Sequence, residues 1–94
     1  MKITINNQDY EFKFRFKELT ELTKQTGKEL SDLEEVAKDI TKTSIIFSIG
    51  CKISLEQAEN ILDEGTFNDV TIVINAFSSE VVKYLNPNSP SQTV

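Results

Sequence analysis

Few side chains in this chain of 94 residues could carry out covalent chemistry. It contains no histidine and a single cysteine, Cys51. A serine or cysteine nucleophile needs an adjacent general base, and the commonest one, histidine, is absent. Cys51 also lies in the most apolar stretch of the chain, where burial raises the pKa of a thiol and keeps it unreactive. The sequence therefore predicts a non-enzymatic protein with a buried structural cysteine.

Carboxylates are the other groups that could bind a metal or act as an acid or base. Five of them are close together in the C-terminal half of the sequence: Glu56, Glu59, Asp63, Glu64 and Asp69. Their spacing lacks the alternating acidic positions and the central glycine of an EF-hand calcium loop. A zinc site would need histidine or a second cysteine. The three glycines, Gly27, Gly50 and Gly65, are isolated and form no phosphate-binding loop. We therefore expect no metal, no cofactor and no catalytic residue, and interpret the carboxylates as solvated helix faces.

The charge is acidic overall and unevenly spread. The formal net charge is −5; residues 1–28 hold six basic and four acidic side chains, and residues 29–94 hold four basic and eleven acidic ones. Nucleic-acid phosphates repel such a chain, so nucleic acid is not an expected partner. No apolar stretch approaches the roughly 20 residues of a membrane helix, and the N-terminus has no signal-peptide core. These features favour the cytoplasm and no membrane contact.

An alternating apolar pattern predicts a β-hairpin at the N-terminus. Ile3 and Ile5 alternate with polar residues, and after Asn6-Asn7-Gln8-Asp9 the alternation resumes at aromatic positions: Tyr10, Phe12, Phe14 and Phe16. With a turn at Asn7-Gln8, Ile5 would lie opposite Tyr10 and Ile3 opposite Phe12, all on one face. Two strands alone are marginally stable in water, so this face must pack on the helices or on a partner.

Helical periodicity follows the hairpin. A first helix runs from Phe16 towards Gly27, and a second is expected over residues 32–51, with Leu33, Val36, Ala37 and Ile40 in its apolar stripe. Periodicity alone does not decide whether residues 45–51 are helix or strand; the flanks favour a helix, which should be central. Capping boxes at Ser54-Gln57 and Thr66-Asp69 begin two more helices, the last with the stripe Val70, Val73, Ile74, Phe77, Val81, Tyr84 and Leu85.

The expected fold is thus α+β and mainly α, with an N-terminal β-hairpin packed on a bundle of about four helices. Residues 1–86 form one domain, and residues 87–94, after the helix stop at Asn86-Pro87, are expected to be a flexible, disordered tail. By elimination the chain works by binding. Tyr10 and Phe12 are expected to pack inward, whereas Phe14, Phe16 and Phe47 are the candidate partner-binding residues of an exposed groove.

Several stretches also match a known pattern of residue types. At the N-terminus these are Lys2-Ile3-Thr4-Ile5-Asn6, Tyr10-Glu11-Phe12-Lys13-Phe14 and Phe16-Lys17-Glu18-Leu19. Further along they are Ile46-Phe47-Ser48-Ile49-Gly50 and the ten residues from Leu55 to Glu64. Over residues 2–85 the chain resembles the small tail assembly chaperones of long-tailed bacteriophages and prophages. One departure is the hairpin turn, where Asn6-Asn7 replaces the glycine-containing turn that such proteins often carry.

This resemblance implies a non-enzymatic role in virion assembly. Such chaperones bind the tape measure protein in the host cytoplasm before the tail tube polymerises around it, and they are absent from the mature virion. Many acquire an extension by ribosomal frameshifting that recruits the tail tube protein. Self-association along the tape measure is a further expectation, since the oppositely charged parts of the chain favour head-to-tail contacts.

A different class of binding protein stays open as an alternative: a small acidic inhibitor that mimics nucleic acid and binds a basic partner. Salt dependence separates the two, because the affinity of a charge mimic falls steeply with salt and that of an apolar groove does not.

Overall fold

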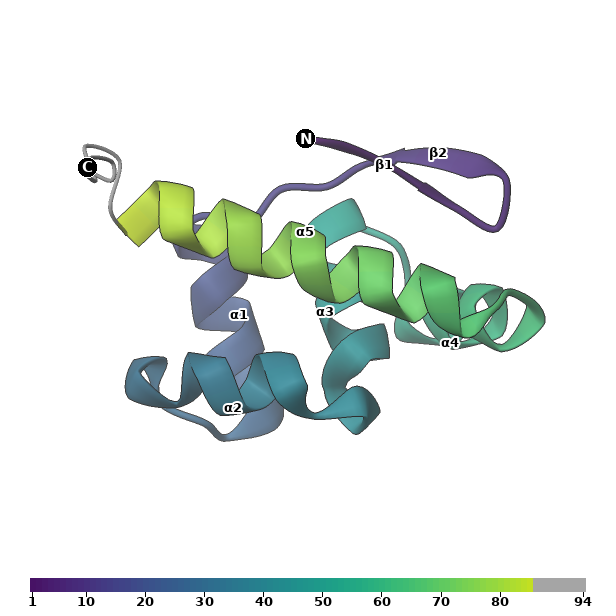
Figure 1. The fold of residues 1–94 in the computed structure, drawn as a ribbon. Helices are drawn as coiled ribbons and strands as arrows, with labels where there is room; N and C mark the ends of the chain where they lie inside the picture. Colours follow the sequence, from purple (N-terminus) through teal and green to yellow (C-terminus); the bar gives the residue numbers. More distant parts are fainter. Residues whose placement is uncertain (86–94) are drawn as a thin grey trace.

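The computed structural model describes residues 1–85 and consists of a hairpin followed by helices (Figure 1). The hairpin pairs β1 (Lys2–Ile5) with β2 (Gln8–Glu11). The α-helices are α1 (Phe16–Thr26), α2 (Leu33–Lys38), α3 (Thr43–Cys51), α4 (Leu55–Glu64) and α5 (Phe67–Leu85), and two 3-10 turns, η1 (Leu30–Asp32) and η2 (Ile40–Lys42), precede α2 and α3. The predicted class, mainly α with an N-terminal hairpin, is confirmed. The disordered tail predicted for residues 87–94 lies outside the described residues.

The hairpin turn falls one residue earlier than predicted. Ile3 pairs with Tyr10 and Ile5 with Gln8, so Asn6-Asn7 is the two-residue turn and the predicted Asn7-Gln8 turn is wrong. Asn6 and Asn7 have φ angles of 51° and 67°. A tight I′-type turn needs positive φ at both central positions, and asparagine tolerates this conformation far better than glutamine. The correction shifts the pairing by two positions, which leaves the apolar side chains on the same face.

The hairpin is fastened to both α3 and α5. The Tyr10 ring meets Phe47 of α3 edge to face, with centroids 5.3 Å apart. At the turn, the Asn6 N–H donates to the buried carboxylate of Asp69 in α5, at 3.1 Å. The same carboxylate accepts from the Thr66 N–H at 2.9 Å and so caps α5. Asp69 thus joins the start of the last helix to the turn of a hairpin more than 60 residues earlier.

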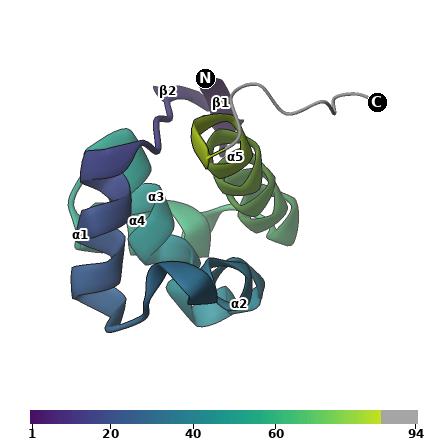
Figure 2. The same ribbon diagram turned by 90° about the vertical axis from the view of Figure 1, so that its left-hand side faces the viewer.

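Helix α3 is the central element, as predicted for the second half of the expected 32–51 helix, and residues 45–51 are helical rather than extended. It touches β2, α1, α4 and α5. Figure 2 shows how the other helices surround it, with α1 on one side and α2 below. Ile46, Phe47 and Gly50 are its buried core positions. The backbone leaving β2 joins this core, because the Lys13 N–H donates to the Gly50 carbonyl at 3.0 Å.

The prediction of one helix over residues 32–51 is wrong, because the chain breaks at Asp39. Asp39 is extended, with φ −93° and ψ 104°. Its carboxylate accepts from the Thr41 N–H at 3.0 Å and from the Thr41 hydroxyl at 2.6 Å, which lowers the pKa of Asp39. A short side chain that bonds to the backbone two residues ahead competes with the helical ladder. The break turns Ile40 outward, although the sequence placed it in a buried stripe.

The other helix-end signals are present. Gly27 ends α1 in the left-handed conformation, with φ 71°. Ser54 and Gln57 form the reciprocal capping box of α4, and Gly65 follows that helix. The second predicted box is completed on one side only, because the Asp69 N–H bonds to the Thr66 carbonyl rather than to its hydroxyl. None of the helices within residues 1–85 is both long and apolar enough to cross a membrane.

Gly50 is expected to tolerate no larger side chain. A Cβ added there would overlap the fully buried ring of Phe12, which is itself backed by Phe14. Gly50→Ala should therefore cost about 2–3 kcal/mol of unfolding free energy, as overpacked cores do. Gly27→Ala is the matched control: nothing lies within 4 Å of its added Cβ, so only the positive φ of 71° is strained. We expect a cost of about 1 kcal/mol there. Urea denaturation of the two variants measures both, and equal losses would contradict the packing argument.

Candidate partner-binding cleft

The three phenylalanines predicted to bind a partner have very different environments. Phe14 and Phe47 are fully buried, so the expectation that they are exposed is wrong. Phe14 packs edge to face on Phe77 of α5, with centroids 4.8 Å apart, and Phe47 packs edge to face with Tyr10. Phe16, by contrast, is 64% exposed. As predicted, Phe12 is buried and Tyr10 packs against the core. Of the predicted site, only Phe16 therefore offers an accessible ring.

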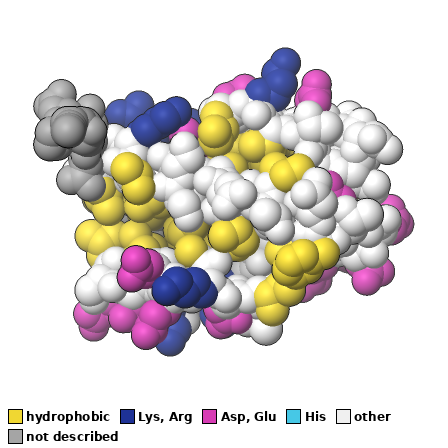
Figure 3. All heavy atoms as spheres, in the orientation of Figure 1, with side chains coloured by type: hydrophobic (Ala, Val, Ile, Leu, Met, Phe, Trp, Pro, Cys, Tyr) yellow, Lys and Arg dark blue, Asp and Glu magenta, His cyan; other side chains and the backbone are white. Residues whose placement is uncertain are grey.

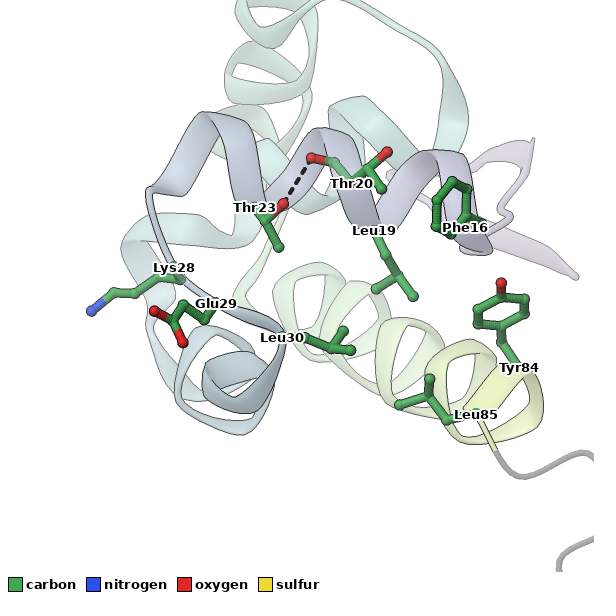
Figure 4. Close-up of a pocket in the computed structure, with 9 residues that line it drawn as sticks. All are labelled: Phe16, Leu19, Thr20, Thr23, Lys28, Glu29, Leu30, Tyr84 and Leu85. Atoms are coloured by element: carbon green, nitrogen blue, oxygen red, sulfur yellow. Dashed lines mark hydrogen bonds between the residues drawn. The ribbon is translucent and has the colours of Figure 1, made fainter.

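Phe16 lies at one end of an apolar cleft of about 440 Å³ between α1, η1 and the end of α5 (Figure 4). Its lining residues are Phe16, Leu19, Thr20, Thr23, Lys28, Glu29, Leu30, Tyr84 and Leu85. In Figure 4, Leu19, Leu30 and Leu85 face the space between the helices, while Lys28 points away from it. Figure 3 shows hydrophobic atoms gathered at the surface near the C-terminal end of α5. Leu30 and Leu85 are 54% and 45% exposed, so the walls of the cleft are only partly covered by the protein itself.

The local sequence explains how these walls form. The backbone leaves β2 at Glu11 and enters α1 at Phe16, with Arg15 as the extended residue before the helix. Gly27 then turns the chain back in its left-handed conformation, which sets Leu30 of η1 against α1. Tyr84 and Leu85, in the last turn of α5, close the third side. Apolar side chains of α1, η1 and α5 thus surround a gap that none of them fills.

Sequence reasoning missed most of this cleft. Leu30 lies in the break between two expected helices, where no periodic pattern draws attention to it. Tyr84 and Leu85 continue the apolar stripe of α5, which predicted burial on the core. The available signal was weak: a leucine between Glu29 and Ser31, where a connecting turn is usually polar.

The two threonine hydroxyls that line the cleft are already hydrogen-bonded within α1. The Thr20 hydroxyl donates to the Lys17 carbonyl and the Thr23 hydroxyl to the Thr20 carbonyl, both at 2.9 Å. Small-molecule sites usually combine an apolar lining with a few converging polar groups that fix the orientation of the ligand. Here both hydroxyls point their hydrogen bonds back into α1. The cleft is therefore suited to apolar contact rather than to polar recognition within it.

A second hollow of about 320 Å³ adjoins the first and is strongly basic. Phe16 and Tyr84 line both hollows, and the second adds Lys13, Arg15 and Lys17. The Arg15 guanidinium lies over the Tyr84 ring, 5.8 Å from its centroid, a distance at which cation–π attraction holds the side chain. The two hollows together form one groove, apolar at the Leu30 end and basic at the Lys13 end.

Glu18 also lines the basic hollow, but its charge is already paired. Its carboxylate accepts from the Arg15 N–H at 2.8 Å and lies 3.2 Å from the Lys52 ammonium. Burial alone would raise the pKa of Glu18; these hydrogen bonds outweigh it and lower the pKa below its usual value of 4.5. Glu18 therefore stabilises the start of α1 and does not neutralise Lys13 or Lys17.

The lowered pKa predicts an acid-sensitive contribution of Glu18 to stability. Its folded-state pKa lies below its unfolded value, so the contribution is complete above about pH 4.5 and is lost as the pH falls through the lower folded-state pKa. Glu18→Gln should cost about 1 kcal/mol at pH 7 and almost nothing at pH 2, by urea denaturation at both pH values. Glu34→Gln, at an exposed position of α2, controls for the lost charge. A deficit that persists unchanged at pH 2 would contradict the assignment.

Cys51 ends α3, away from the cleft; it is only partly buried, so the predicted burial of this cysteine is incomplete. Burial, reinforced by the Glu11 carboxylate, raises the pKa of the Cys51 thiol to about 12. At neutral pH the nucleophilic thiolate is therefore scarce, in keeping with the prediction of an unreactive cysteine. Among residues 1–85, no three histidine, cysteine, aspartate or glutamate side chains gather in a way that could hold a metal ion.

Comparison with known proteins provides no information on function, so the geometry of this groove is the main guide to it. No family model, no curated protein and no solved structure matches the chain.

Proposed function

We propose that the chain is a non-enzymatic tail assembly chaperone that binds an apolar stripe of the phage tape measure protein in the cleft between α1, η1 and α5. The proposal joins the sequence resemblance over residues 2–85 to one structural observation: the cleft is apolar, open, and lined by half-exposed Phe16, Leu30 and Leu85. Amphipathic helices bind in such grooves through apolar residues spaced three and four apart.

A tape measure protein presents the matching surface. It is a long helical chain with apolar stripes that stay unprotected until the tail tube encloses it. A chaperone for it needs contacts that hold in solution and yield when the tube assembles. A groove with a few half-exposed apolar residues, and with no polar group directed into it by Thr20 or Thr23, supports contacts of this kind. Two further parts belong to the proposal: recruitment of the tail tube protein through a frameshifted extension, and self-association of copies along the tape measure.

The direct test uses a tape measure protein from the phage or prophage to which the proposal assigns this chain. Overlapping fragments of it, each about 40 residues, are titrated with the labelled chain in fluorescence anisotropy. We expect one or several fragments to bind with dissociation constants of roughly micromolar strength, as small transient interfaces do. If every fragment fails to bind at 100-fold higher concentrations while the chain is folded by circular dichroism, the proposed function is wrong.

A further inference from the structure

The groove carries a local charge opposite to that of the whole chain. The formal net charge is −5, yet the hollow beside Phe16 and Tyr84 is lined by Lys13, Arg15 and Lys17. At physiological salt the Debye length is about 8 Å, so a ligand in the groove responds to these three cations more than to distant carboxylates. The groove is therefore locally attractive to negative charge.

The three cations are available to a ligand. All three side chains are exposed, and none of them forms an ion pair with a carboxylate of residues 1–85. The nearest carboxylate along the helix, that of Glu18, is bonded to the Arg15 N–H and to Lys52. Arg15 is held in place over the Tyr84 ring. A cation fixed at the junction of the two hollows loses less conformational entropy on binding than a free surface side chain does.

The order of the two hollows constrains the ligand further. Phe16 and Tyr84 separate an apolar space of about 440 Å³ from a basic one of about 320 Å³. A single ligand helix lying along both hollows would place its apolar side chains between α1 and the end of α5. Its residues one or two helical turns from those side chains would then lie over Lys13 and Lys17. Carboxylates at those positions would pair with the cations, and lysines would be repelled.

We propose that the groove selects amphipathic helices whose apolar stripe is accompanied, one or two turns away, by aspartate or glutamate residues placed over Lys13, Arg15 and Lys17. This rests on the proposed function, in that the cleft is a docking site for a helix. Residues 86–94, the part of the chain nearest in sequence to Leu85, contain no acidic side chain and few apolar ones, so their composition does not match this ligand.

The test uses two synthetic helical peptides with the same leucine stripe. One carries three glutamates at the positions expected over the basic hollow, and the other carries three lysines there. Fluorescence anisotropy at 50 and 300 mM salt gives their affinities for the intact chain. We expect the glutamate peptide to bind about tenfold more tightly at low salt, since each exposed charge pair contributes modestly, and the preference to shrink at high salt.

Two charge variants identify the cations responsible. Lys13→Glu with Lys17→Glu should abolish or invert the preference for the glutamate peptide. Lys38→Glu with Lys42→Glu changes the net charge equally at the end of α2 and in η2, outside both hollows, and should preserve it. Circular dichroism confirms that both double variants are folded.

The outcomes separate this inference from the proposed function. Equal affinity for the two peptides, with both lost in Leu30→Asp, would overturn the charge selection and leave the cleft as a docking site. A preference unchanged in Lys13→Glu/Lys17→Glu would overturn it as well. Two other occupants are also tested: deletion of residues 86–94 that raises both affinities and removes the preference for the glutamate peptide would assign the cleft to the chain's own end, and a dimer in light scattering that Leu30→Asp dissociates, with no peptide binding to the monomer, would assign it to a second copy. Either result would overturn the inference.

Discussion

Replacing Phe14 with alanine should cost about 3–5 kcal/mol of unfolding free energy, the usual range for a buried aromatic residue. Phe14 has no exposed surface and lies between the Phe12 and Phe77 rings, at centroid distances of 5.6 and 4.8 Å. Its removal leaves a cavity at the point where the hairpin, α5 and the start of α1 meet. Small domains have about 5–15 kcal/mol of stability in total, so Phe14→Ala is expected to leave a substantial unfolded fraction at 37 °C.

Phe16→Ala, two residues further on, is the matched control. Its ring is 64% exposed, so the same change in chemistry should alter the unfolding free energy by no more than about 0.5–1 kcal/mol. Urea denaturation followed by circular dichroism measures both variants. If Phe14→Ala proved as stable as Phe16→Ala, the segment between β2 and α1 would not pack on α5 through Phe14 as described. The contrast also matters for binding studies, because lost binding in Phe14→Ala reports unfolding, whereas lost binding in Phe16→Ala reports the cleft.

The difference between these two phenylalanines shows where sequence reasoning ends. The alternation from Tyr10 to Phe16 predicted one apolar face, and burial follows this alternation as far as Phe14. Strand β2 ends at Glu11, and the period of two no longer holds at Phe16, because the backbone enters α1 there. Phe14 then follows the connection into the core, while Phe16 becomes the first residue of a helix and points outward. Only the path of the connection decides this, and that path depends on contacts with α3 and α5 that are distant in sequence.

Structural features that depend on neighbouring residues agree with the sequence predictions better than features that depend on distant ones. The cap at Ser54, the left-handed Gly27 and the central position of residues 45–51 all depend on a few neighbouring residues or on a long apolar run. The break at Asp39 depends on a competition between the helix and a carboxylate that bonds to Thr41, and periodicity does not register such a competition. The cleft exists because no side chain fills the space between Leu19, Leu30 and Leu85. Sequence patterns predict which residues pack together, but they do not predict where the packed side chains leave a space unfilled.

Leu30→Asp should weaken binding of a tape measure fragment by at least about 30-fold, a loss of roughly 2 kcal/mol, as for a central residue of a docking site. Leu30 is the only residue of η1 that lines the cleft, and it lies across from Leu19 and Leu85 (Figure 4). An aspartate there would have to be desolvated against an apolar ligand, which is costly. Because Leu30 is 54% exposed in the free chain, stability should change by about 0.5 kcal/mol or less.

Leu55→Asp provides the matched control, because it introduces the same charge at another exposed leucine, the first residue of α4, which lines neither hollow of the groove. Anisotropy titrations should show wild-type affinity for Leu55→Asp and the 30-fold loss for Leu30→Asp, with both variants folded. Equal losses in the two would indicate that added negative charge, wherever it lies, repels the ligand. Unchanged binding by folded Leu30→Asp would place the docking surface elsewhere on the molecule. A selective loss would tie helix binding to the gap between α1, η1 and α5, the feature on which the proposed chaperone role depends.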